Sequence, residues 1–155
     1  MILAALAAVL FTAPPAAAAE PRPFTSDFTI EASFAPMPVP GVFAVTTSGA
    51  GHASHLGKVT VSSSETLDFV SSPGTVTLDD GRLVMTAANG DQLYWSYEGT
   101  GSAPDENGES ALAGTFVITG GTGRFSDAAG DGSLHGTGNA VTGMASLTYH
   151  GSISY

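Results

Sequence analysis

The chain contains no cysteine, and only four of its 155 residues are lysine or arginine. Without cysteine, no disulfide can hold the fold together, so its stability has to come from a hydrophobic core. Fourteen acidic residues against four basic ones give a formal net charge of −10. Nucleic-acid binding requires clustered positive charge, so this balance argues against a nucleic-acid partner. It also disfavours anionic membrane surfaces, for the same reason.

A long apolar run is missing too, except at the start of the chain. Ile2–Phe11 is apolar, and Pro14, Pro15 and the small residues Ala16–Ala19 follow it. This pattern is typical of a secretory signal peptide that is cleaved after Ala19. We therefore expect residues 1–19 to be removed and residues 20–155 to form one domain that is secreted or periplasmic, with no membrane insertion after cleavage. A membrane anchor is the alternative, but the run is shorter than the ~20 apolar residues of a span.

No segment shows the i, i+3, i+4, i+7 apolar spacing of an amphipathic helix. Alternation of apolar and polar residues is widespread instead, and it is clearest in the segment Phe24–Phe34. Turn residues separate such segments, with predicted hairpin turns at Asp79–Gly81 and Asn89–Gly90. The pattern predicts an all-β fold of roughly eight to ten strands. A small closed antiparallel barrel is favoured because closure leaves no exposed edge on the long last strand, 142–155.

A glycine-rich corner follows the predicted strand Ser110–Thr119. It consists of Gly120, Gly121, Gly123, Arg124 and Phe125. The glycines allow the backbone to reverse sharply, so the Phe125 ring can fold back and close one end of the core. We expect Arg124 to form a structural ion pair with Asp127. A phosphate-binding loop is disfavoured, because neither a Gly-Lys-Ser/Thr sequence nor a helical pattern follows the glycines.

Three segments resemble the allene oxide cyclase and dirigent superfamily, and most of all its small exported bacterial members. They are the strand that runs into Gly120–Phe125, the segment His55–Val61, and the segment Ala87–Asp91. The resemblance covers the chain from about residue 52 onward, and it implies a closed antiparallel β-barrel. It implies no single activity, because cyclases of this superfamily enclose a reactive oxylipin whereas dirigent proteins orient phenoxy radicals. The functional residues of those proteins cannot be placed on this chain.

His55 and Asp91 are candidate ligand-binding residues. Together at a barrel mouth they would form a carboxylate–imidazole pair able to orient a ligand or move a proton. The alternatives are structural: a buried histidine bonded to backbone, and an aspartate that caps its own turn. Trp95, Tyr97 and Tyr149 are further candidates, because aromatic rings with polar tips suit a ligand pocket as well as a packed core.

No cofactor and no metal are expected. His52 and His55 are three residues apart, so on a strand they would point to opposite faces and could not share one ion. The leading hypothesis is an exported barrel that binds a small hydrophobic molecule in its lumen. The alternatives are an enzyme that controls a reactive hydrophobic substrate, as a cyclase, an isomerase or a dirigent protein would, and a structural secreted domain with a filled core. A homo-oligomer is compatible with each.

Overall fold

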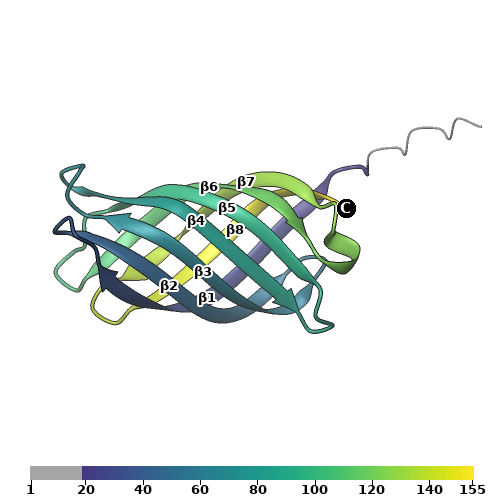
Figure 1. Ribbon diagram of the computed structural model, residues 1–155, viewed down its shortest axis with the longest axis horizontal. Coiled ribbons are helices and arrows are strands. Elements are labelled where there is room, and N and C mark those ends of the chain that lie inside the picture. Colours follow the sequence, from purple (N-terminus) through teal and green to yellow (C-terminus); the bar gives the residue numbers. More distant parts are fainter. Residues whose placement is uncertain (1–18) are drawn as a thin grey trace, which may run out of the picture.

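The computed structural model describes residues 19–155, which form a closed barrel of eight antiparallel strands (Figure 1). In chain order they are β1 (Arg22–Pro36), β2 (Val42–Ala53), β3 (Gly57–Asp68), β4 (Thr75–Ala87), β5 (Gln92–Ser102), β6 (Glu109–Gly121), a 3-10 turn η1 (Gly123–Phe125), β7 (Ala129–Asn139) and β8 (Met144–Ser154). Each strand pairs with the next, and β8 closes onto β1. The predicted all-β fold and the closed antiparallel barrel are confirmed. The predicted signal peptide lies outside the described residues, apart from Ala19.

The predicted hairpin turn at Asp79–Gly81 is wrong. This segment is an irregularity inside β4, where the register against β5 shifts between Leu78 and Gly81. Asp80 has a φ of 55°, which an Asp-Gly pair supports in a bulge as readily as in a turn. The chain continues in the same direction because both flanking segments pair with β3 and β5. The turn predicted at Asn89–Gly90 does connect β4 to β5, and Gly90 has a φ of 90°.

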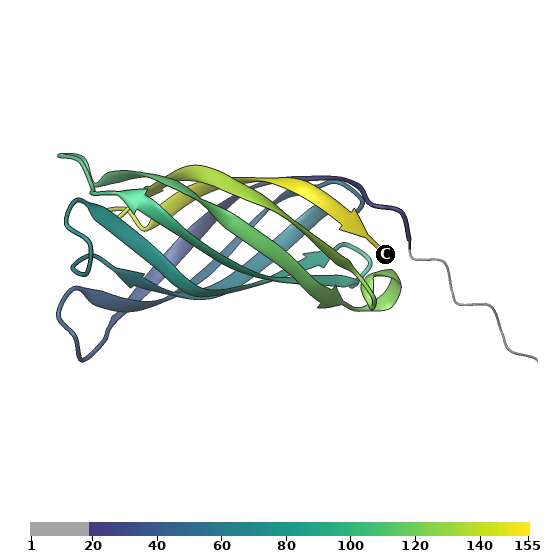
Figure 2. The ribbon, with the colours of Figure 1, turned by 90° about the horizontal axis from the view of Figure 1, so that it is seen from above.

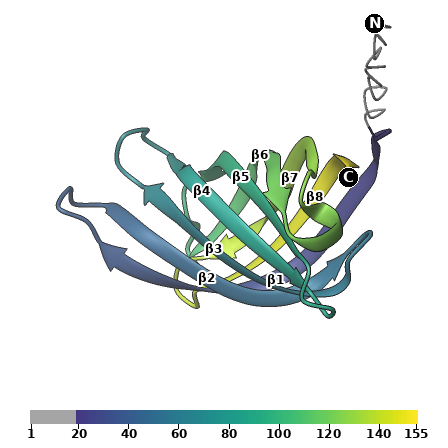
Figure 3. The ribbon, with the colours of Figure 1, turned by 45° about the vertical axis from the view of Figure 1, so that its right-hand side comes forward.

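The two ends of the barrel differ. One end, here called the mouth end, carries the loops 37–41, 69–74, 103–108 and 140–143 (Figures 1 and 2). The other, here called the corner end, carries the loops 54–56 and 88–91, the η1 segment, the start of β1 and the C-terminus. Between them the strands wrap diagonally around the lumen (Figure 3), as the closure of an eight-stranded sheet requires.

Aromatic side chains fill the half of the lumen that is nearer the corner end. Trp95 is 1% exposed, and its ring centroid lies 5.8 Å from that of Phe24, 5.6 Å from Phe116 and 5.2 Å from Tyr149. Phe28 stacks on Tyr149 at 5.2 Å. These rings come from β1, β5, β6 and β8, so one cluster ties strands on opposite walls together.

Glycine on the inner face of β7 lets the wall come close to these rings. Gly132 pairs with Gly151 on β8. A Cβ at Gly132 would lie 2.1 Å from the carbonyl oxygen of His150 and 2.7 Å from Cε1 of Phe116. Such contacts are too short for any side chain, so the Phe116 ring occupies the space that a larger residue would need.

The glycine corner closes this half of the barrel, as predicted. Phe125 is fully buried, and its ring centroid lies 4.8 Å from that of Tyr155. Gly120 and Gly123 have φ values of 133° and 56°, which glycine adopts without strain. The ion pair predicted between Arg124 and Asp127 is replaced by another, because Arg124 Nε lies 3.9 Å from Asp91 Oδ2.

Candidate functional site

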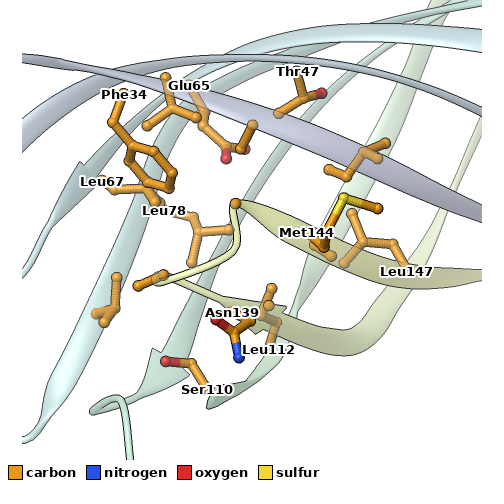
Figure 4. Close-up of a pocket in the computed structure, with 18 of the residues that line it drawn as sticks. Phe34, Thr47, Glu65, Leu67, Leu78, Ser110, Leu112, Asn139, Met144 and Leu147 are labelled. Carbon is orange, nitrogen blue, oxygen red and sulfur yellow. The ribbon is translucent and has the colours of Figure 1, made fainter. Parts of the chain in front are cut away.

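A pocket of about 80 Å³ occupies the half of the lumen that is nearer the mouth end. All eight strands contribute to its lining, which is largely aliphatic. The few polar groups face one another across it: Glu65 and Thr47 on one side, Ser110 and Asn139 on the other (Figure 4). Small residues on β7 and β8, including Gly138 and Ala145, line the same space. Because these residues are small, the lumen stays open at this level, whereas aromatic rings fill it nearer the corner end.

Glu65 is the one charged residue in the lining. It lies on β3, where Val59, Val61 and Leu67 on the same face also point into the lumen. The Tyr97 hydroxyl donates a hydrogen bond to Glu65 Oε2. Burial raises the pKa of the Glu65 carboxyl above 4.5, and this hydrogen bond offsets part of that rise. A carboxyl group thus lines a pocket whose wall is otherwise largely apolar.

Tyr149 brings a second polar atom to the pocket. Its side chain is fully buried, and its hydroxyl has no hydrogen-bond partner among residues 19–155. Burial raises the pKa of Tyr149, and the nearby Glu65 charge raises it further. The Trp95 side chain lowers the pKa of Tyr149 by a smaller amount. The Trp95 Nε1 also has no hydrogen-bond partner of normal geometry among residues 19–155. An unpaired buried hydroxyl costs about 1–3 kcal/mol, so a ligand atom that pairs with it would gain affinity.

The rim of the pocket is apolar. Among the described residues, every large hydrophobic side chain that is exposed lies at the mouth end, except Val117 on β6. The rim consists of Phe34, Met37, Val39, Val70, Val141 and Met144. Phe34 and Met144 also line the pocket, so the apolar surface continues from solvent into the lumen. Exposed apolar side chains that cluster in one patch indicate a contact site, whereas single scattered ones do not.

The basic residues lie away from the mouth end, whereas acidic residues lie at both ends of the barrel. Arg22, Lys58 and Arg124 lie at the corner end, and Arg82 lies on the outer face of β4. The mouth end carries Asp68, Asp105, Glu106 and Glu109, and no lysine or arginine lies in its loops. A surface of one sign next to a pocket of low dielectric constant attracts ligands of the opposite sign.

His55 lies at the corner end, away from the pocket. Its Nε2 donates to the Pro23 carbonyl at 2.8 Å, and its Nδ1 lies 3.3 Å from the Tyr155 hydroxyl. Its backbone has a φ of 68°, and its carbonyl accepts a hydrogen bond from Arg124. These contacts match the backbone bonding of the structural alternative, although His55 is only partly buried.

Asp91 is near His55 only through Arg124, which contacts both residues. Its carboxylate accepts from Asn89 Nδ2 at 3.0 Å, and its backbone N–H donates to Asn89 Oδ1 at 3.1 Å. Asp91 therefore belongs to its own turn. Of the other candidates, Tyr97 and Tyr149 line the pocket, whereas Trp95 lies beneath it in the aromatic cluster.

Sequence reasoning missed Glu65. Glu65 follows three serines, Ser62–Ser64, which resemble a connection between strands in the sequence. The structure has a single strand, β3, with an irregularity against β4 between Ser64 and Thr66. The alternation from Val59 to Leu67 could have shown that Glu65 faces the same side as the valines.

Comparison with protein families, curated proteins and solved structures found no match. Between residues 19 and 155, no three histidine, aspartate or glutamate side chains are grouped so that they could hold a metal ion. No helix in that range is long and apolar enough to cross a membrane.

Replacing Glu65 with glutamine is expected to stabilise the protein at neutral pH. Because folding raises the pKa of Glu65, the stability that this group contributes is fully present below pH 4.5 and is lost as the pH rises through the folded pKa. The neutral amide removes this loss and still accepts from Tyr97. We expect the free energy of unfolding at pH 7 to rise and to depend less on pH than that of the parent, measured by urea denaturation at several pH values.

The exposed Glu31 on β1 provides the control. Glu31→Gln makes the same change in net charge and should leave both the stability and its pH dependence close to those of the parent. The parent protein should lose stability between pH 4.5 and pH 7. If Glu65→Gln loses as much stability over the same range, Glu65 is not the group with the raised pKa.

Proposed function

We propose that this protein binds a small apolar molecule in the mouth half of its lumen. The observation that carries the proposal is the contrast between the two halves of one barrel. Aromatic rings fill the corner half, whereas the mouth half retains a pocket with an apolar wall, an apolar rim and few polar groups. Ligand pockets have this composition in general.

The volume of the pocket limits the size of the enclosed part of the ligand. An apolar cavity of about 150 Å³ holds benzene, and this pocket has about 80 Å³. A short alkyl chain or a small branched group therefore suits the enclosed space. A larger ligand would extend past Phe34 and Met144 onto the rim.

The open pocket argues against the alternative of a structural barrel with a filled core. Export of the mature chain and membership of the allene oxide cyclase and dirigent superfamily stay predictions. They agree with this proposal, because a superfamily barrel would hold its ligand in the lumen.

Six-carbon probes test the proposal: 1-hexanol, hexylamine and hexanoate, each titrated into the protein and followed by calorimetry. We expect at least one of them to bind and to raise the melting temperature. Ala145→Phe should weaken that binding at least tenfold, because Ala145 lines the pocket and a ring at this position would fill it.

Ser146→Phe is the matched control. Ser146 is the next residue on β8 and is exposed on the outer face, so the same ring there should leave binding unchanged. If none of the three probes binds, or if the two variants bind equally, the mouth half of the lumen is not a ligand site.

A further inference from the structure

We infer that the ligand of this pocket carries a protonated amine, and that the Glu65 carboxylate binds it. The inference rests on the proposed function and specifies the chemical class of the ligand. It begins with the hydrogen bonds of Glu65. Tyr97 occupies Oε2, whereas Oε1 has no hydrogen-bond partner among the residues that the structure describes. One carboxylate oxygen is thus left for a donor that enters from the pocket.

The protein supplies no cation to Glu65. The pocket lining contains no lysine, arginine or histidine. Arg82 pairs with Ser64, the neighbour of Glu65, but it faces outward and is exposed. Glu65 is partly buried, and a carboxylate that is removed from water without a cation is destabilised by desolvation. An ammonium group from the ligand would supply both the missing charge and the missing donor.

Tyr149 adds a second contact of the right kind. Tyr149 and Glu65 line the same pocket, and burial and the Glu65 charge both raise the pKa of the Tyr149 hydroxyl. An ammonium group has three donors. One can reach Glu65 Oε1 and another the lone pairs of the Tyr149 hydroxyl, which has no partner in the described part of the chain. A carboxylate ligand would instead face Glu65 as a like charge.

The approach to the pocket favours the same ligand class. Asp68, Asp105, Glu106 and Glu109 surround the mouth end, while three of the four basic residues lie at the opposite end. The resulting field attracts a cation and repels an anion. The apolar rim then contacts the hydrocarbon part of the ligand, so a lipophilic amine satisfies the carboxylate, the pocket wall and the rim.

Among the residues that line the pocket, Glu65 is the one through which binding of an amine should depend on pH. Hydrogen bonds lower the pKa values of Asp68 and Asp105 at the mouth end. The titratable groups that face Glu65 are Tyr97 from β5 and Tyr149 from β8, and burial holds the pKa of each well above its usual value. The other lining residues from β2 and β4, such as Thr47 and Leu78, are uncharged. An alkylamine stays protonated over the same range, since the comparable lysine ammonium has a pKa of about 10.4.

The test compares hexylamine, 1-hexanol and hexanoate, which share a chain length and differ in the head group. At pH 8 and low salt we expect hexylamine to bind at least tenfold more tightly than 1-hexanol, and hexanoate to bind most weakly. Glu65→Gln should remove the preference for hexylamine and leave 1-hexanol binding within about threefold, whereas Glu31→Gln should keep the preference. For the unmodified protein, the affinity for hexylamine should fall as the pH is lowered towards 4.5, while that for 1-hexanol stays level.

The outcomes separate the amine assignment from the proposed function. Equal binding of hexylamine and 1-hexanol, a preference that survives in Glu65→Gln, or an affinity for hexylamine that does not change with pH would overturn the amine assignment and leave the apolar pocket standing. Failure of all three probes would overturn the proposed function itself. If Glu65→Gln does not fold, the pH titration of the unmodified protein still decides the inference.

Discussion

Trp95→Ala is expected to lower the free energy of unfolding by about 3–5 kcal/mol, the range for removing a large buried aromatic side chain. The indole is 1% exposed and packs against rings from β1, β6 and β8. The neighbouring rings are anchored on strands that are paired on both sides, so they cannot close the space that the indole leaves. Trp95 is the only tryptophan, so unfolding in urea should be followed by circular dichroism.

Val117→Ala on the outer face of β6 is the control for this variant. Val117 is 52% exposed, so its truncation should cost less than about 0.5 kcal/mol. The mouth pocket supplies a second readout. Tyr149 lies between Trp95 and the pocket, and the loss of the indole should let apolar probes longer than six carbons bind more tightly than they do to the parent. A loss of stability below about 1 kcal/mol would mean that the aromatic cluster does not hold the barrel together.

The fold was predictable because alternation of apolar and polar residues shows which segments are strands and which face of each strand is buried. In β1, every second residue from Phe24 to Ile30 is buried, Ser26 included, and the residues between them, Thr25, Asp27 and Thr29, are exposed, as the period of two requires. The glycine corner was predictable for a similar reason, since closely spaced glycines followed by a phenylalanine describe a local reversal and its cover. Both features depend on neighbours in the sequence.

The pocket was not predictable, because it depends on register across strands. Gly138, Ala145 and Ala32 are small, but they leave a void only if the eight strands bring them to the same level of the lumen. Glu65 was missed because strand register is irregular at Glu65 and at Asp80, and the polar residues at both places resemble turns in the sequence. His55 and Asp91 lie at the closed end of the barrel, where Arg124 contacts the His55 carbonyl and the Asp91 carboxylate.

Phe125→Ala should have an effect of similar size, about 3–5 kcal/mol, because the Phe125 ring is fully buried at the closed end and packs on Tyr155. The cause differs from that for Trp95. Phe125 covers the end of the core rather than its centre, so its removal admits water between η1 and the last residues of β8. Hydrogen exchange should therefore speed up first near Ile153 and Ala129, which the β7–β8 ladder places beside this end.

Arg124→Ala is the matched control, one residue away. The Arg124 side chain is 52% exposed, and its ion pair with Asp91 spans 3.9 Å. Exposed pairs of this kind contribute up to about 1 kcal/mol, so this variant should lose far less stability than Phe125→Ala.

Because the ligand pocket opens at the other end, Phe125→Ala should still bind a six-carbon probe within about threefold of the parent at a temperature where it is folded. Equal losses for the two variants would show that the ring does not seal the barrel. Loss of probe binding in folded Phe125→Ala would show that the two halves of the lumen are not independent.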